Sequence, residues 1–129
     1  MEKIPAGTWI VVADGAGARV FTNVGDDRKL SLRQDDLLSQ DDVEGGPSKL
    51  PKDHTDADIG EAAFSQQLAQ RINAAALKNQ FEHLVLIADP HSLGRMRPLL
   101  HKQTLSRLVG ELAKTLTNSP IEDIERALS

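Results

Sequence analysis

Residues 84–97 read Leu-Val-Leu-Ile-Ala-Asp-Pro-His-Ser-Leu-Gly-Arg-Met-Arg, and this stretch decides the fold. Its first five residues are all apolar, which is typical of a strand that is covered on both faces. Asp89-Pro90 ends the strand, because proline has no N–H to donate to a neighbouring strand. From His91 onward the apolar residues follow helical spacing. A buried strand that ends in an acidic turn before a helix is the usual position of a site in an open α/β sheet.

The composition predicts a single globular domain. The 129 residues are 40% hydrophobic and 26% charged, which is ordinary for a chain that buries one core. The absence of cysteine excludes disulfides and thiolate metal sites, and it agrees with a cytoplasmic location. The start of the chain lacks the apolar core of a signal peptide, and no run approaches the roughly 18 apolar residues of a membrane span. We therefore expect residues 1–129 to form one cytoplasmic α/β domain.

Acidic residues are concentrated in one segment. Residues 35–61 contain nine acidic residues and two lysines, a net charge of −7, while the rest of the chain carries +3. Residues 37–59 within this segment follow no sustained period and contain several glycines and prolines. A stretch of this length without secondary structure is usually functional or disordered. We expect a mobile acidic loop at about 37–59.

The N-terminal third predicts three strands in an antiparallel meander. Residues 8–13 are apolar and β-branched, and residues 18–23 and 29–34 alternate between apolar and polar side chains. Short turns rich in Gly and Asp separate the three runs. The third run is the most polar, so we expect it at the edge of the sheet.

The rest of the chain predicts helices and one ambiguous segment. Residues 60–79 form the clearest amphipathic helix, with Arg71 and Lys78 on its polar side. A second helix is expected at 91–101, with a kink or an early end at Pro98. Ser119 is the predicted N-cap of a final helix, with Pro120 in its first position. Residues 105–116 fit a helix by spacing, but 107–112 also fit a short buried strand.

Three motifs together resemble the bacterial host attachment proteins, described as required for attachment to host cells. The first is Thr-Trp-Ile-Val-Val-Ala-Asp-Gly-Ala-Gly-Ala-Arg-Val-Phe at 8–21, which looks like the opening of that family. The second is the central stretch at 84–97, with its Ala-Asp-Pro and Leu-Gly-x-x-Arg. The third runs from Gly110-Glu111-Leu112 through Leu116-Thr117 to the Ser-Pro before the last helix. The resemblance covers nearly the whole chain except the acidic loop.

The resemblance implies a fold. The host attachment family is similar to the middle domain of archaeal and eukaryotic peptide release factors, which has a ribonuclease-H-like arrangement. Its order is three antiparallel strands, helix, strand, helix, strand, helix. We therefore expect a five-stranded mixed sheet with helices on both faces, and the resemblance favours a strand at 107–112.

Asp14 and Asp89 follow two apolar strands that are neighbours in the implied fold. Ribonuclease-H-like nucleases place metal-binding carboxylates on these strands, and such sites need at least three oxygen ligands around Mg²⁺. Glu61 and Glu111 are the candidates for a third ligand. The simpler interpretation, which we favour, is that Asp14 closes a hairpin turn and Asp89 caps the following helix. We expect no cofactor, and Mg²⁺ belongs only to the nuclease alternative.

Six residues near the expected strand ends are the candidates for binding: Asp14, Arg19, Asp89, His91, Arg95 and Arg97. A modest basic strip follows the central strand and consists of Arg95, Arg97, His101, Lys102 and Arg107. Because aromatic residues are only 3% of the chain, the strip lacks partners for stacking bases. A solvated helix face is therefore its simplest interpretation.

These observations lead to one functional prediction and two alternatives. The preferred hypothesis is a non-enzymatic adaptor or interaction domain of the host attachment family with an unknown protein partner. The first alternative is a ribosome- or RNA-associated protein similar to release factors, and the second is a divalent-metal nuclease using Asp14 and Asp89. A homodimer that pairs the polar third strand across a two-fold axis is a further prediction.

Overall fold

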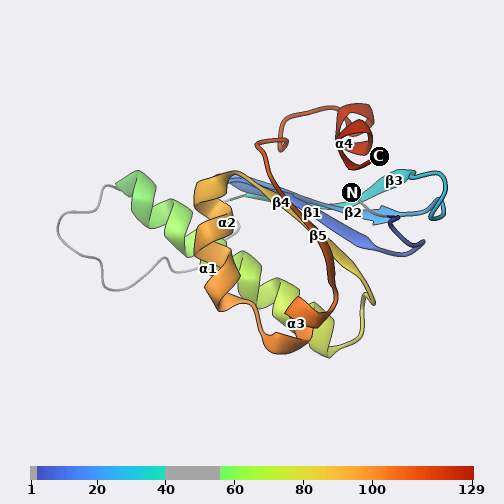
Figure 1. Cartoon of the computed structure of the whole chain (residues 1–129). Coiled ribbons are helices and arrows are strands. Elements are labelled where there is room, and N and C mark those ends of the chain that lie inside the picture. The colour runs from blue at the N-terminus through green and yellow to red at the C-terminus, as the bar shows by residue number, and fades with distance from the viewer. Residues whose placement is uncertain (1–2, 40–55) are drawn as a thin grey trace.

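A computed structural model of the chain describes residues 3–39 and 56–129, in which five strands form one mixed sheet (Figure 1). The strands lie in the order β3-β2-β1-β4-β5. Their bounds are β1 Trp9–Ala13, β2 Gly17–Asn23, β3 Leu32–Ser39, β4 Leu84–Ala88 and β5 Leu108–Ala113. The helices are α1 Asp56–Leu77, α2 Pro90–Met96, the 3₁₀-helix η2 Arg97–Leu99, α3 Lys102–Ser106 and α4 Ile121–Leu128.

Helices cover both faces of this sheet, as the sequence predicts. On one face α1 and α2 pack on the sheet, with Phe64, Leu68 and Met96 buried against it. On the other face α4 buries Ile124 and Leu128. Figure 1 shows α1, α2 and α3 on one side of the strands and α4 on the opposite side. Each face therefore has its own apolar core.

The central strand β4 has the bounds that its apolar run predicts. It pairs in parallel with β1 on one side and with β5 on the other. All five of its side chains are fully buried. A strand with helices over both faces and strands at both edges must be apolar throughout, which explains the uninterrupted run.

The third strand differs from its prediction at 29–34, because β3 begins at Leu32 and continues to Ser39. The carboxylate of Asp26 accepts hydrogen bonds from the backbone N–H groups of Arg28 (2.9 Å) and Lys29 (2.8 Å). This side-chain turn holds the segment before Leu32 out of the sheet. The edge position of β3 is confirmed.

Both ends of the acidic loop predicted at 37–59 belong to regular secondary structure. Its first residues, 37–39, belong to β3, and its last residues, 56–59, form the start of α1. The helix therefore begins four residues earlier than the predicted 60–79. Residues 40–55, on which the rest of this prediction falls, lie outside the described residues.

The predicted break at Pro98 is confirmed. The helix α2 ends at Met96, a 3₁₀ turn follows, and α3 starts at Lys102. The buried amide of Asn73 on α1 holds this break, because it donates to the carbonyl oxygen of Leu99 (2.9 Å) and accepts from the backbone N–H of His101 (2.9 Å). The hydroxyl of Thr104 also donates to its oxygen, at 2.7 Å.

The ambiguous segment is a strand, and β5 at Leu108–Ala113 lies one residue beyond the predicted 107–112. The final helix starts one residue later than expected. Its N-cap is Pro120, and no side chain caps it, so the prediction of Ser119 as N-cap is wrong. The carbonyl oxygen of Ser119 instead accepts a hydrogen bond from Arg19.

Candidate functional site at the carboxyl ends of β1 and β4

The parallel pair of β1 and β4 brings Asp14 and Asp89 to the same edge of the sheet. Ala13 and Ala88 are register partners at the ends of these strands, and each acidic residue directly follows one of them. The side chains of the two acids are held in different ways.

Asp14 closes the turn between β1 and β2. One of its oxygens accepts from the backbone N–H groups of Ala16 (2.7 Å) and Gly17 (2.8 Å). The other accepts from the hydroxyl of Thr117 at 2.5 Å, across 103 residues of sequence. The predicted turn role is confirmed, and both oxygens of this carboxylate are engaged.

Arg19 of β2 binds the segment that connects β5 to α4. Its guanidinium donates to the carbonyl oxygens of Thr117 (3.1 Å) and Ser119 (2.6 Å) and to the side-chain oxygen of Gln34 (2.9 Å). The group also lies 4.9 Å from the centre of the Phe21 ring. Since Phe21 belongs to the core under α4, Arg19 lies on the α4 side of the sheet.

Asp89 caps α2, as the sequence predicts. One of its oxygens accepts from the backbone N–H of Ser92 at 3.1 Å. The other is buried, and no hydrogen-bond partner for it occurs among the described residues. His91 next to it is exposed and forms no hydrogen bond or ion pair within the part of the chain that the structure describes.

The two arginines of α2 and η2 are paired with acidic residues of other elements. Arg95 contacts Glu61 of α1 at 3.2 Å, and Arg97 contacts Glu111 of β5 at 2.9 Å. Glu61 also packs closely on the turn after β1, because a Cβ atom at Gly15 would lie 2.5 Å from its Cγ. The two ion pairs therefore connect α2 to α1 and η2 to β5.

The structure thus divides the six predicted binding residues. Asp14 and Arg19 hold the connection before α4, whereas Asp89 caps the start of α2 and Arg95 lies in its last turn. No group of three or more His, Asp or Glu side chains within residues 3–39 and 60–129 could hold a metal ion. The proposed third ligands Glu61 and Glu111 are in ion pairs. The geometry is therefore that of structural hydrogen bonds and ion pairs.

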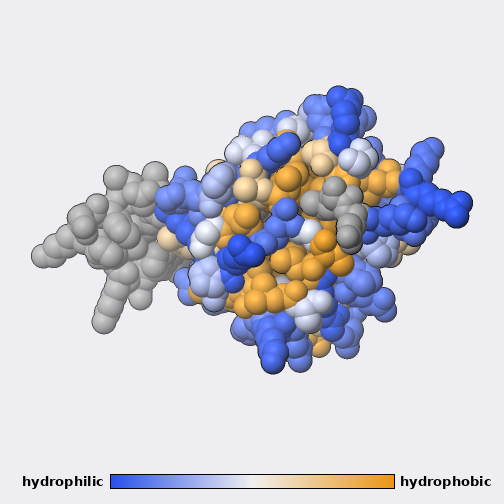
Figure 2. Space-filling model, viewed as in Figure 1, coloured by the Kyte–Doolittle hydropathy of each residue, from blue (hydrophilic) through white to orange (hydrophobic). Residues whose placement is uncertain are grey.

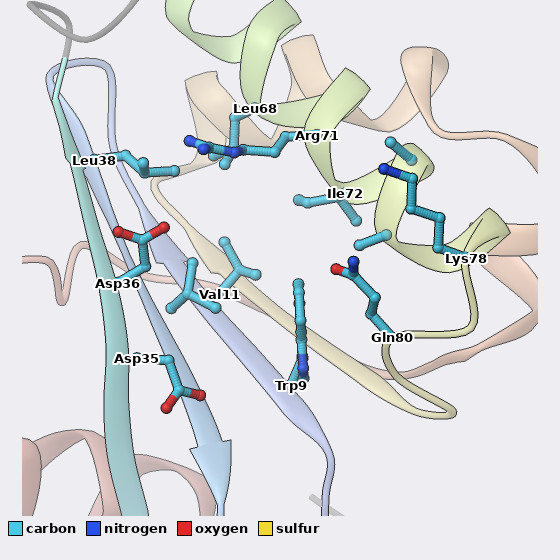
Figure 3. Close-up of a pocket in the computed structure, with 13 residues that line it drawn as sticks. Trp9, Val11, Asp35, Asp36, Leu38, Leu68, Arg71, Ile72, Lys78 and Gln80 are labelled. Carbon is cyan, nitrogen blue, oxygen red and sulfur yellow. The ribbon is translucent and has the colours of Figure 1, made fainter.

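A groove between α1 and β3 was not predicted, and it has a volume of about 390 Å³. Figure 3 shows Leu38 and Asp36 on the β3 wall, Arg71 and Lys78 on the α1 wall, and Trp9 standing at one end. Its floor is apolar and includes Val11, Val20, Leu68 and Ile72. Trp9 is half-buried and packs on Phe81, with ring centres 4.9 Å apart. The sequence signal for this groove is the pair of cations seven residues apart in the helix predicted at 60–79.

The walls of the groove carry opposite charges. Burial of Asp35 raises the pKa of its carboxyl, but hydrogen bonds from Arg33 and Thr22 outweigh this and leave the pKa below its ordinary value. Arg71 and Lys78 are exposed, and neither forms an ion pair with a residue that the structure describes. The α1 wall therefore presents unneutralised positive charge.

Together, the fold and the site define an α/β domain with a mixed sheet, whose strand ends are held by hydrogen bonds and ion pairs. The model of Bacterial archaeo-eukaryotic release factor family 12 matches residues 7–128, and the chain belongs to this family. No curated protein matches the chain. None of the helices in the described ranges is both long enough and apolar enough to cross a membrane.

Proposed function

We propose that the chain is a non-enzymatic domain that binds the ribosome. The observation that carries this proposal is membership in a release-factor family over residues 7–128, since release factors act on ribosomes. The strand order β3-β2-β1-β4-β5 agrees with the ribonuclease-H-like arrangement of the release-factor middle domain, which we propose for this chain as well. A ribosome-bound domain would act in the cytoplasm.

The state of the carboxylates supports binding rather than catalysis. The carboxylate of Asp14 accepts three hydrogen bonds, and Glu61 and Glu111 face arginines. A two-metal nuclease needs carboxylate oxygens that converge on the ions. The nuclease alternative is therefore less well supported than binding.

The basic strip is a weaker candidate for the ribosome-binding surface than the α1 wall of the groove. Within the strip, Arg95 and Arg97 face carboxylates, and Arg107 donates to the carbonyl oxygen of Phe81 and to Asn79. The α1 wall offers Arg71 of α1 and Lys78, the residue directly after α1, without an acidic partner in the described part of the chain. We assign these two cations to phosphates of ribosomal RNA.

The test is co-sedimentation of the full chain with purified ribosomes over a range of salt concentrations. If two phosphates are neutralised, the slope of log K against log[salt] should be roughly −1.4 to −1.8. The double variant Arg71→Glu/Lys78→Glu should lower the affinity at least about tenfold, a loss of ~1.4 kcal/mol. Lys114→Glu is the matched control, because Lys114 is exposed and lies outside the groove. Absence of ribosome binding at low salt, or equal binding by both variants, would overturn the proposal.

A second candidate is an adaptor for another protein, as the resemblance to host attachment proteins implies. The apolar floor of the groove favours it, because RNA phosphates do not require such a floor. In this case a purified protein partner would bind with little salt dependence, and substitution of Trp9 would weaken it more than reversal of Arg71. Attachment to host cells would then be an indirect consequence of that interaction.

A further inference from the structure

The two edge strands of the sheet are protected to different degrees. An open edge strand can pair with a strand of another molecule, and proteins prevent this with charges and bulges. The edge strand β3 carries Arg33, Asp35 and Asp36. The pairing of each edge strand with its neighbour contains one irregularity, at Val20/Phe21 for β3 and at Leu84/Val85 for β5, so the charges distinguish the two edges. The edge strand β5 contains one ionisable residue, Glu111. Its carboxylate faces Arg97 and its side chain is only 19% exposed, so the edge of β5 is nearly neutral.

Exposed apolar side chains occur on this nearly neutral edge and on the elements that precede it. Val109 of β5 is 39% exposed, and Leu99 and Leu105 on the preceding elements are each 42% exposed. Leu108 and Leu112 of the same strand are half-buried, and they pack against the cores on the two opposite faces of the sheet. Figure 2, viewed as Figure 1, shows apolar atoms gathered on the front of the molecule, where β5 and α3 lie. Exposed apolar patches of this kind usually mark an interaction surface.

The backbone of β5 adds a second, independent feature. Strand β5 pairs with β4 on one side only. No backbone hydrogen bond to its other side is made by the residues that the structure describes. The complement of such a row of N–H and C=O groups is another strand.

We propose that β5 pairs antiparallel with β5 of a second copy of this chain across a two-fold axis, which makes one continuous sheet through both copies. With a two-fold axis perpendicular to the sheet, the apolar patch and the strand edge of one copy face the same patch and the same edge of the other copy, as an isologous interface requires. Charge selects β5 over the predicted β3, because two β3 edges would bring together Asp35 and Asp36 of both copies. At β5 the one carboxylate is already neutralised by Arg97. This proposal does not rest on ribosome binding.

Sedimentation equilibrium of the full chain at rising concentration tests the proposal. The wild-type chain should reach twice the mass of one chain, and Val109→Lys should weaken the dimer at least about tenfold, or ~1.4 kcal/mol. Leu37→Lys is the matched control, because Leu37 is 64% exposed on the opposite edge strand. Its dimer should equal that of the wild type.

Hydrogen exchange provides a readout that needs no variant. Amide protons of β5 should exchange more slowly as the concentration of the wild-type chain rises, while those of β3 should not change. A chain that stays at the mass of one copy at all concentrations would overturn the proposal. A dimer that Leu37→Lys disrupts and Val109→Lys does not would overturn it as well.

Discussion

The guanidinium group of Arg19 donates a 2.6 Å hydrogen bond to the carbonyl oxygen of Ser119, which lies 100 residues further along the chain. The same group donates to the carbonyl oxygen of Thr117, whose hydroxyl donates in turn to Asp14. The turn after β1, the strand β2 and the connection from β5 to α4 are therefore held as one unit. Helix α4 covers its face of the sheet with Ile124 and Leu128, and this connection positions it.

Replacing Arg19 should loosen α4. We expect Arg19→Ala to lower the free energy of unfolding by about 1–3 kcal/mol, because partly buried carbonyl oxygens would lose their donor. Arg19→Lys should recover only part of this loss, since an ammonium group cannot reproduce the forked geometry of a guanidinium. Urea unfolding measures the loss, and faster hydrogen exchange in α4 would locate it. Arg28→Ala, at an exposed turn, is the control; equal effects of Arg19→Ala and Arg28→Ala would contradict the role given to Arg19.

Removal of the Asn73 amide should destabilise the break between α2 and α3. Asn73 is 4% exposed and bonds to Leu99, His101 and Thr104. Asn73→Ala leaves these groups without their partner, so we expect a loss of about 2–3 kcal/mol. The denaturant midpoint should fall with little change in the m-value. The exposed Gln70→Ala on the same helix serves as control, and a similar midpoint for both variants would exclude this role for Asn73.

The parts of the fold that depend on short-range pattern could be predicted from the sequence. The apolar run of β4 is stable only as a buried strand, and Pro98 cannot continue the interior of a helix because it has no N–H to donate. The start of β3 could not be predicted in this way. Its residues alternate from Lys29 onward, but the Asp26 side chain bonds the backbone there into a turn. A local side-chain hydrogen bond thus outweighs the strand-like alternation of apolar and polar residues that starts at Lys29.

The candidate site was predictable in its placement but not in its chemistry. Parallel neighbours bring their carboxyl ends to one edge of the sheet, so Asp14 and Asp89 had to lie at the same edge. The partners of these residues lie far away in sequence, as Thr117 does from Asp14. Likewise, no periodicity could reveal that Glu61 and Glu111 would face arginines. Pairing over such separations depends on the packed structure.

The tight contact between Gly15 and Glu61 predicts strong coupling between these two positions. A Cβ atom at Gly15 would lie 2.5 Å from Cγ of Glu61, which must move away from Arg95. We expect Gly15→Ala alone to cost about 1–3 kcal/mol by overpacking. In a Glu61→Ala background the same change should cost much less, because the obstructing side chain is gone. A double-mutant cycle in urea measures this coupling, and additive effects would show that the contact is unimportant.

The pair of Asp35 with Arg33 predicts a stability difference that depends on pH. Hydrogen bonds from Arg33 and Thr22 hold the folded pKa of Asp35 below its ordinary value of 3.8, despite the opposing effect of burial. Ionised Asp35 therefore contributes stability that is fully present above pH 3.8 and is lost as the pH falls through the folded pKa. Because this pair lies near the surface, we expect Asp35→Asn to cost less than about 1 kcal/mol at pH 7.

This cost should shrink as the pH is lowered below 3.8 and as salt is added at neutral pH, since salt screens exposed charges. The difference in the free energy of unfolding between the wild type and Asp35→Asn is measured at pH 7 and again below pH 3.8. Arg33→Gln provides the matched background, in which Asp35→Asn should have a smaller effect because the main cation is absent. A difference that persists unchanged at the lowest pH would mean that Asp35 stabilises β3 through its shape and neutral hydrogen bonds rather than through its charge.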